Sequence, residues 1–371
     1  MKQLVRENIL EMEPYPPGKP IKEVERELGV GRVIKMASNE NPLGPSPRAV
    51  EAMARVLPEV NLYPDGNAYY LKRALAVHLG VKEGNIILGN GSDEIIRMIT
   101  ETFLNGGEEA VIAEPSFLIY RLAVKAMNGQ CRLVALKDFT HDLVAMAEMI
   151  NERTKLIFIA NPNNPTGTMV TAEAVDSLMK KVPGEIIVIL DEAYYEYIER
   201  DDFPRALDYI KRGRNVITLR TFSKIYGLAG LRIGYGIAGE ELIRDMNRVR
   251  QPFNTNSLAQ VAALAALEDR EHLEKSRRVN RDGKNFLYQE LDRLQFSYIP
   301  SEANFILVDV KEDAKVLSLR LMPEGIIVRP MGMYNLPGFI RVTIGTGEQN
   351  RKFIKALQKI ENRRQNTEDR L

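Results

Sequence analysis

A lysine and an aspartate each follow a short apolar run of the sequence. Lys224 comes after the run Val216–Leu219, with two hydroxyl residues before it and a glycine-rich segment after it that ends in Arg232. Asp191 directly follows the run Ile186–Leu190. A lysine amine can bond covalently to an aldehyde, and a carboxylate at the end of a buried run needs a cationic partner. These residue types predict covalent chemistry on a carbonyl group beside a buried positive charge.

Two further loops carry groups suited to a phosphate and to a directed amide. The segment Gly89–Glu94 follows the run Ile86–Leu88 and opens a helical pattern, so its backbone N–H groups can face a phosphate. The loop Asn161–Gly167 contains three asparagines and two prolines, which make a rigid turn. Phe117, after another apolar run, can stack on a flat ring. Each of these features alone also fits an ordinary capped turn or core packing.

Taken together, these groups match the needs of one cofactor, pyridoxal phosphate (PLP). Its aldehyde needs a lysine, and its pyridine nitrogen needs a carboxylate that keeps the ring able to accept electrons. Its phenolate oxygen needs donors such as asparagine and tyrosine. Its phosphate needs backbone N–H groups, hydroxyls and an arginine. We therefore expect the chain to bind PLP.

The apolar runs before these groups have the length and pattern of buried strands. Runs without alternation indicate strands covered on both faces, and the 30-residue spacing of the last three is that of βαβ units. Ligands of such sheets bind beyond the carboxyl ends of the strands. We predict an α/β fold with a doubly wound, mostly parallel sheet. The predicted strands are Ile86–Leu88, Ala110–Ala113, Leu156–Ala160, Ile186–Leu190 and Val216–Leu219, with Cys131–Leu136 as a weaker candidate.

The chain is predicted to have three parts. Residues 46–265 hold the predicted sheet and form the large PLP-binding α/β domain. Residues 1–45 are rich in proline and are expected to form an N-terminal arm that is part of the small domain. Residues 266–371 begin with a long charged helix and continue with strands and helices, which predicts a smaller C-terminal α+β domain.

Composition argues against several classes of protein. The 371 residues include 51 Lys plus Arg and 50 Asp plus Glu, a balance unlike that of nucleic-acid or membrane-surface proteins. One cysteine and three widely separated histidines argue against disulfides and a metal site. No apolar run approaches 18 residues, and the first residues lack a signal-peptide pattern. We expect a cytoplasmic enzyme that uses no metal, nucleic acid or membrane.

Four motifs resemble those of fold-type I PLP-dependent aminotransferases of class I/II: NPNNPTG (161–167), DEAY (191–194), TFSKIYGLAGLRIGY (221–235) and FIRVTIGT (339–346). The resemblance implies an aspartate-aminotransferase-like large domain. It implies that Lys224 bonds the aldehyde and moves a proton between substrate and cofactor. Asp191 would pair with the pyridine nitrogen, and Asn164 and Tyr194 would bond the phenolate oxygen. The other cofactor contacts that it implies, mostly at the phosphate and with the aromatic ring against the cofactor, are Gly91, Ser92, Asp93, Phe117, Thr221, Ser223 and Arg232.

Three N-terminal motifs resemble the histidinol-phosphate aminotransferases: PYPPGKP (14–20), KMASNENPLGPSP (35–47) and LYPDG (62–66). This subfamily, part of histidine biosynthesis, converts L-histidinol phosphate and 2-oxoglutarate into imidazole acetol phosphate and L-glutamate. The resemblance implies a homodimer in which Tyr63 reaches the PLP phosphate of the other subunit. Phe117 departs from a tyrosine that is frequent in the subfamily, which removes a hydroxyl. The substrate contacts that it implies are Tyr15, Asn39, Asn164, Arg329 and Arg341.

Alternatives of the same fold stay open at this point. An aromatic amino-acid aminotransferase or a threonine-phosphate decarboxylase would carry the same cofactor motifs. A PLP-binding transcription regulator would need a helix-turn-helix module, for which the residues before 46 leave too little chain. A Rossmann dehydrogenase is disfavoured because Glu94 stands where the third glycine of G-x-G-x-x-G would be.

Overall fold

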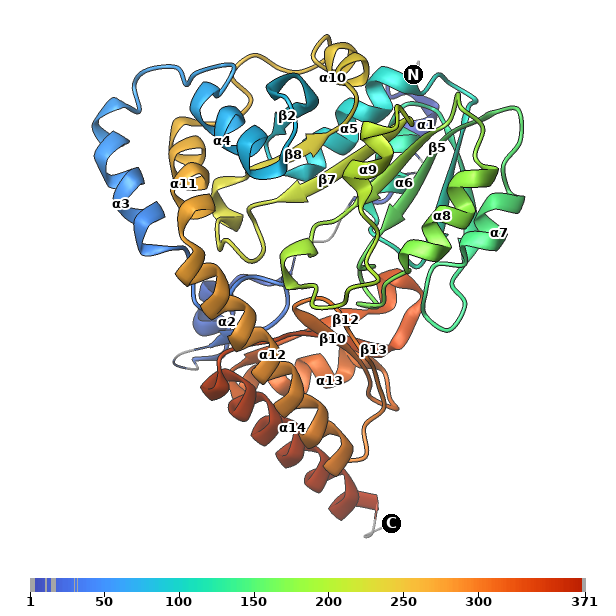
Figure 1. The fold of residues 1–371 in the computed structure, drawn as a ribbon. Helices are drawn as coiled ribbons and strands as arrows, with labels where there is room; N and C mark the ends of the chain where they lie inside the picture. Colours follow the sequence, from blue (N-terminus) through green and yellow to red (C-terminus); the bar gives the residue numbers. More distant parts are fainter. Residues whose placement is uncertain (1–3, 11, 15–17, 30, 32, 369–371) are drawn as a thin grey trace.

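A seven-stranded sheet forms the centre of the larger part of the molecule (Figure 1). The computed structural model describes residues 4–10, 12–14, 18–29, 31 and 33–368. In order across the sheet, the strands are β2 (Ile86–Gly89), β8 (Gly234–Ile237), β7 (Val216–Thr221), β6 (Ile187–Asp191), β5 (Thr154–Ala160), β3 (Glu109–Glu114) and β4 (Gln130–Ala135).

The sheet is mostly parallel, as predicted. β8 runs antiparallel to both of its neighbours, while the other neighbouring strands pair in parallel. Every apolar run that was predicted as a strand forms one. β8 was not predicted, because two of its four residues are glycines, which strands disfavour. In the sheet, Gly236 lies so close to Ile87 and Ile95 that an added Cβ would approach them to 3.1–3.2 Å.

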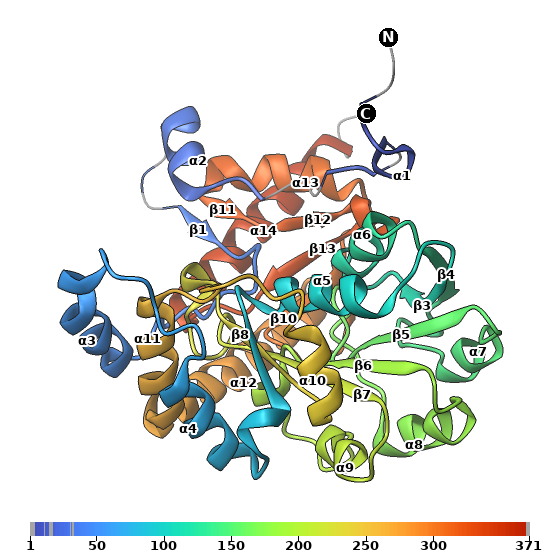
Figure 2. The same ribbon diagram turned by 90° about the horizontal axis from the view of Figure 1, so that it is seen from above.

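Helices cover both faces of this sheet, because successive side chains of its strands point to opposite faces. Along β5, Ile157 and Ile159 belong to one apolar cluster, and Phe158 belongs to another on the opposite face. Figure 2 shows α5 and α6 on one side and α8 and α9 on the other. One face is covered by α4 (Tyr69–Leu79), α7 (Leu143–Glu148), α8 (Ala172–Lys181), α9 (Ala206–Lys211) and α11 (Ser257–Glu268). The other face is covered by α5 (Ser92–Phe103), α6 (Ile119–Ala126) and α10 (Glu240–Met246).

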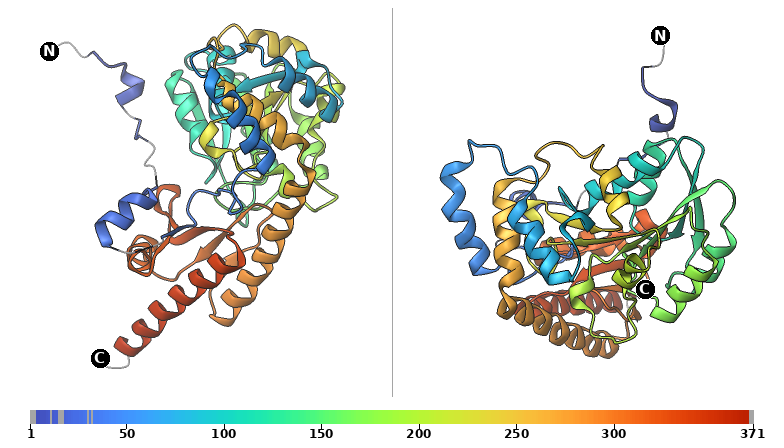
Figure 3. Two further views of the ribbon diagram at one scale, coloured as in Figure 1. Left: turned by 90° about the vertical axis from the view of Figure 1, so that its left-hand side faces the viewer. Right: turned by 45° about the horizontal axis from the view of Figure 1, so that its top comes forward.

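A second, antiparallel sheet follows later in the chain. Its strands, in order, are β12 (Arg329–Met331), β13 (Leu336–Thr343), β10 (Phe305–Asp309) and β9 (Tyr298–Ile299). Its helices are α12 (Arg270–Arg293), α13 (Ala314–Leu321) and α14 (Gly347–Glu368), of which α12 and α14 lie side by side (Figure 3). The N-terminal strand β1 (Ile34–Lys35) pairs in parallel with β11 (Ile326–Ile327), so residues far apart in sequence join here.

Three more helices lie in the first part of the chain: α1 (Glu7–Leu10), α2 (Ile21–Leu28) and α3 (Pro47–Val56). Ser46 caps α3, and its hydroxyl accepts a hydrogen bond from the Ala49 N–H at 3.4 Å. Ser46 also donates to Asp269, which caps α12, so the starts of two distant helices are joined. Among the described residues, no helix combines the length and the apolar character needed to cross a membrane.

Candidate active site

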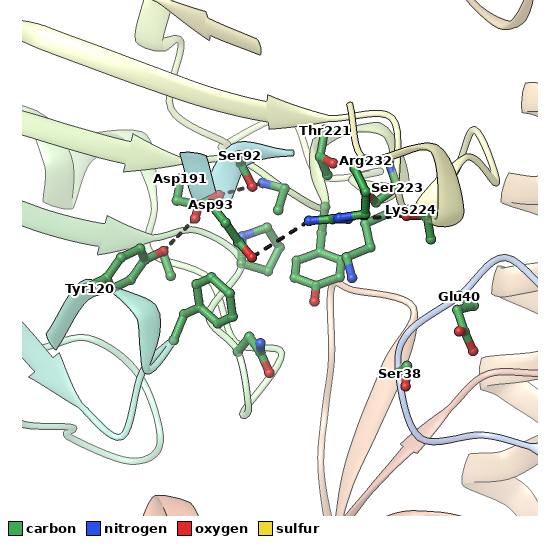
Figure 4. A pocket seen from close by; sticks show the side chains of 17 residues that line it. Ser38, Glu40, Ser92, Asp93, Tyr120, Asp191, Thr221, Ser223, Lys224 and Arg232 are labelled. Carbon is green, nitrogen blue, oxygen red and sulfur yellow. Dashed lines mark hydrogen bonds and ion pairs between the residues drawn. The ribbon is translucent and has the colours of Figure 1, made fainter. Parts of the chain in front are cut away.

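The carboxyl ends of β2, β5, β6 and β7 face one cavity (Figure 4). This is where an open α/β sheet binds ligands, because loops from several parallel strands meet there. Ten of the residues predicted to contact a cofactor line this cavity: Ser92, Asp93, Phe117, Asn164, Asp191, Tyr194, Thr221, Ser223, Lys224 and Arg232. Residues scattered over some 140 positions of sequence therefore form one site.

Asp191 is the buried acid of the cavity, with 5 % of its surface exposed. Burial raises the pKa of this carboxyl group to about 6, while hydrogen bonds from Tyr120 and from the Ala193 N–H oppose that rise. The Tyr120 hydroxyl donates to Asp191 Oδ2 at 2.6 Å, and the Ala193 N–H donates to Oδ1 at 3.1 Å. In the described part of the chain, no cationic side chain forms an ion pair with Asp191. The carboxylate is thus prepared for a cationic N–H group of a ligand.

Lys224 lies on the turn that follows β7. Its Nζ atom is 5.7 Å from the centre of the Tyr194 ring, and it has no hydrogen-bond or ion-pair partner among the described residues. The turn is tight, because the Gly227 N–H donates to the Lys224 carbonyl at 3.0 Å. Gly227 has φ +71°, and a Cβ there would lie 2.2 Å from the Gly44 carbonyl oxygen. The backbone that carries the lysine is therefore packed directly against another segment, while its amine is free to react.

Asn164 and Tyr194 are each held by a second side chain. The Oδ1 atom of Asn164 accepts a hydrogen bond from Arg341, and the Tyr194 oxygen accepts one from the Asn39 side chain at 2.9 Å. Arg341 also donates to the Ala37 carbonyl at 2.9 Å. These bonds occupy acceptor atoms, so the amide N–H of Asn164 and the hydroxyl proton of Tyr194 remain available as donors. Both donors suit a phenolate oxygen.

The start of α5 forms the phosphate-binding candidate. α5 begins at Ser92, and the N–H groups of a first helical turn have no partners within the helix. Gly91 has φ +78°, which strains any other residue, and its lack of a Cβ lets the Arg232 guanidinium lie directly against the turn, since a Cβ there would be 2.5 Å from Nη2. Arg232 Nη2 is 3.8 Å from Asp93. The turn and the arginine together form a cationic, N–H-rich pocket.

Several predicted residues lie outside the cavity lining. Gly91 lies in the turn next to Arg232, as described above. Asn39 and Arg341 are buried, and they donate hydrogen bonds to Tyr194 and Asn164, respectively. Arg329 is buried near Met333, with Nη2 3.1 Å from the sulfur. Tyr63 is 83 % exposed, and its ring stacks on Phe253 at 4.8 Å. Tyr15 is outside the described residues.

Tyr120 was missed by the sequence reasoning. It is fully buried, stacks on Phe158 at 4.8 Å and meets Phe117 edge-on at 5.6 Å. Its hydroxyl reaches Asp191, 71 residues away in sequence. No sequence signal distinguishes it from a core aromatic of an amphipathic helix. The motif residue Glu192, by contrast, pairs with the buried Arg220 at 2.8 Å.

The groups that line this cavity suit a PLP molecule. Lys224 offers an amine for the aldehyde, and Asp191 offers a buried carboxylate for the pyridine nitrogen. Asn164 and Tyr194 offer donors for the phenolate oxygen, and the α5 start with Arg232 suits the phosphate. Among the described residues, no cluster of three or more His, Cys, Asp or Glu side chains could hold a metal ion.

Comparisons with known proteins agree with this geometry. Residues 31–357 match the family model described as aminotransferase class I and II. The chain is 55 % identical to the histidinol-phosphate aminotransferase of Moorella thermoacetica, over 96 % of this chain and 92 % of that protein. It is 49 % identical to that of Caldicellulosiruptor saccharolyticus, over 96 % of this chain and all of that protein.

Solved structures resemble the chain over nearly its whole length. The histidinol-phosphate aminotransferase of Sinorhizobium meliloti, in complex with pyridoxal-5'-phosphate, has a TM-score of 0.88 at 27 % identity and covers 97 % of this chain and 99 % of its own. The aspartate aminotransferase of Thermus thermophilus, with maleate, has a TM-score of 0.82 at 22 % identity, covers 96 % of this chain and 99 % of its own, and shows the shared fold alone. The predicted aspartate-aminotransferase-like α/β fold is confirmed.

Proposed function

Because this chain belongs to the family of class I and II aminotransferases, which are PLP-dependent enzymes, we propose that it transfers an amino group from L-histidinol phosphate to 2-oxoglutarate. The products would be imidazole acetol phosphate and L-glutamate, in a step of histidine biosynthesis. The observation that carries the substrate is the 55 % identity to a histidinol-phosphate aminotransferase over 96 % of the chain. We place this reaction in the cytoplasm.

The cavity residues have separate tasks in this reaction. PLP, when bound, supplies a ring that accepts electrons from the substrate carbon. Lys224 would hold the aldehyde until the substrate amine replaces it there, and the freed lysine amine would then take the proton from the substrate carbon that carries the amino group. Asp191 keeps a proton on the pyridine nitrogen, and Tyr120 keeps Asp191 ionised by donating to it. These roles need the amine and the carboxylate to line one cavity, as they do.

The other cofactor contacts orient the ring. Asn164 and Tyr194 donate hydrogen bonds to its phenolate oxygen, since their acceptor atoms are occupied by Arg341 and Asn39. Phe117, which lines the cavity, would lie against the ring face. The phosphate is anchored by Gly91, Ser92, Asp93, Thr221, Ser223 and Arg232, chiefly through N–H groups, hydroxyls and the guanidinium.

Arginine side chains can bind both anionic substrates, which enter the same site in turn. Histidinol phosphate carries a phosphate, whereas glutamate carries two carboxylates, and one guanidinium fork matches either group. We assign Arg341 to this task, because it donates to Asn164, which lines the cavity, and its Nε atom has no hydrogen-bond partner among the described residues. We assign Arg329 and Tyr15 to the phosphate of histidinol phosphate. We assign Asn39, which donates to Tyr194, to the substrate contacts.

We also propose a homodimer in which Tyr63 reaches the PLP phosphate of the second subunit. The exposure of Tyr63 supports this assignment, because Tyr63 is 83 % exposed and does not stand alone on the surface. Other large apolar side chains near it in sequence are also exposed: Leu57, Val60, Leu62 and Tyr70. A second copy of the chain would cover them.

A single-turnover panel tests the proposed reaction. The PLP-loaded protein is mixed with L-histidinol phosphate, L-phenylalanine or L-threonine phosphate, and the cofactor absorbance and carbon dioxide release are followed. Bleaching by histidinol phosphate, with little by phenylalanine and no carbon dioxide from threonine phosphate, is expected. Bleaching by phenylalanine alone, or release of carbon dioxide, would assign the chain to one of the other activities of this fold. Lys224→Ala serves as the control that should not turn over any substrate.

A further inference from the structure

A short segment before α3, the strap Ala37–Asn41, is fixed to several parts of the molecule. Its carbonyl at Ala37 accepts from Arg341 at 2.9 Å. The Asn39 N–H donates to the Thr343 hydroxyl at 2.9 Å, and the Asn41 side chain donates to the Ile225 carbonyl at 2.6 Å. The strap therefore has one defined path past the cavity.

The backbone of the strap turns alternate side chains toward the cavity. Asn39 has φ +57°, a left-handed conformation that asparagine tolerates better than most residues. Ala37, Asn39 and Asn41 are buried in the protein, whereas Ser38 and Glu40 line the cavity. In Figure 4, Ser38 and Glu40 lie on the side of the cavity away from Asp191 and Tyr120.

Glu40 presents a carboxylate on that side. Its Oε1 atom accepts from Lys35 Nζ at 2.9 Å, and its Oε2 atom has no hydrogen-bond partner among the described residues. The Glu40 side chain is 45 % exposed, whereas that of Lys35 is only 19 % exposed. Lys35 thus holds one oxygen in place and leaves the other free to accept a hydrogen bond from a ligand.

No group already assigned to the reaction accounts for this carboxylate. The pyridine nitrogen has Asp191, and the remaining cofactor atoms need donors or cations. The phosphate of histidinol phosphate and both carboxylates of glutamate are anions, which a glutamate side chain would repel. Each substrate also carries an amine, but that group has to react at the cofactor aldehyde beside Lys224. Apart from the amine, the one part of either substrate that offers a hydrogen-bond donor is the imidazole ring, which has an N–H group and can bear a positive charge.

We propose that Glu40 binds the imidazole ring of histidinol phosphate by accepting its N–H hydrogen bond, and so selects this substrate by its ring. The inference rests on the proposed function and adds to it the residue that recognises the ring. Glu40 then distinguishes imidazole from a plain phenyl ring, which has no N–H to offer. Its charge also works against glutamate, which therefore has to bind without its help.

The test compares variants on three amino donors. These are L-histidinol phosphate, L-alaninol phosphate, which keeps the amine and the phosphate but lacks the ring, and L-glutamate. The PLP-loaded wild type, Glu40→Gln and Glu40→Asp are compared in single turnover. Glu152→Gln makes the same chemical change at an exposed loop position and is the matched control. Binding of histidinol phosphate and alaninol phosphate is also measured by calorimetry.

Glu40→Gln is expected to lower kcat/KM for histidinol phosphate by about tenfold to a hundredfold, the usual loss for a hydrogen bond to a charged group. Alaninol phosphate should change by less than about twofold, and glutamate should stay equal or react faster, since a like charge has been removed. The kcat/KM of Glu40→Asp for histidinol phosphate should lie between those of wild type and Glu40→Gln. If Glu40→Gln does not fold, Glu40→Asp is compared with wild type on the same three donors. A contact with the ring predicts a loss that is confined to histidinol phosphate, the one donor of the three that has a ring.

Two results would overturn the proposal. Equal losses on all three donors would show that Glu40 only supports the strap, and an unchanged rate with histidinol phosphate would show that it does not touch the ring. The wild-type arm reports separately on the proposed function. A wild type that converts glutamate but not histidinol phosphate would remove both, whereas normal wild-type turnover with either of the two results above removes this inference alone.

Discussion

Replacing Tyr120 by phenylalanine removes one hydroxyl and keeps the ring that packs on Phe158. A hydrogen bond to a charged group contributes about 1.5–3 kcal/mol, and one pKa unit corresponds to about 1.4 kcal/mol. The pKa of Asp191, which is about 6 with the hydroxyl present, should therefore rise to about 7–8 in Tyr120→Phe. At pH 7 the ionised fraction of Asp191 then falls about two- to tenfold, and the affinity for PLP should fall by the same factor.

The titration of Asp191 can be followed directly in the cofactor-free protein. Carbon-13 NMR of protein labelled at the aspartate carboxyls gives its midpoint, and Asp191→Asn assigns the signal by its loss. Tyr197→Phe is the matched control, because Tyr197 is also a buried tyrosine whose hydroxyl bonds to Asn304 and not to Asp191. An Asp191 midpoint in Tyr120→Phe that equals the wild-type value, or lies below it, would refute the reasoning.

Three further predictions concern other parts of the chain. Gly91→Ala places a methyl group 2.5 Å from a guanidinium nitrogen and should weaken PLP binding at least tenfold in an absorbance titration, whereas Gly184→Ala, which meets no atom within 4 Å, should not. Burial lowers the pKa of His141 to about 4, so the imidazole stays neutral in the folded protein, whereas the unfolded chain takes up a proton there below about pH 6.5. Between pH 6.5 and 4, the free energy of unfolding of wild type should therefore fall by about 3 kcal/mol more than that of His141→Leu, as measured by denaturant unfolding. Equal losses in the two proteins would contradict this. In single turnover Arg341→Ala should slow both half-reactions and Arg329→Ala mainly that of histidinol phosphate, and an equal loss for both substrates with Arg329→Ala would count against the split.

The sheet could be predicted from the sequence because its central strands are buried on both faces. Val216–Thr221 and Ile187–Asp191 are buried along their whole length, and their first four residues are apolar except for Thr218. The strand Gly234–Ile237 could not be predicted in this way. Its glycines are required by the close approach of neighbouring residues, so packing outweighs the local preference of the sequence.

The cofactor side of the site could also be predicted, because its residues follow the strands directly. Lys224, Asp191 and Asn164 each come within a few residues of a strand end, and the topology of a parallel sheet then brings them together. Tyr120 and Glu40 could not be found in this way. Tyr120 lies inside a helix with the spacing of a core residue, and the position of Glu40 depends on the left-handed backbone of its neighbour.

The roles of the remaining residues stay predictions. Tyr63 lies on the surface of the chain, and Tyr15 is outside the described residues. The boundaries near residues 45 and 265 also stay predictions. The pairing of β1 with β11 shows why a boundary in sequence is hard to draw here, since the N-terminal segment shares a sheet with residues from the last part of the chain.

The attachment of PLP to Lys224 is the claim that supports every role assigned above. Purified protein is incubated with PLP, reduced with borohydride, digested, and mapped by mass spectrometry. We expect the pyridoxyl group on the peptide that contains Lys224, one group per chain, and none on any peptide of Lys224→Ala. A label on another lysine, or an unlabelled wild-type protein, would contradict the account.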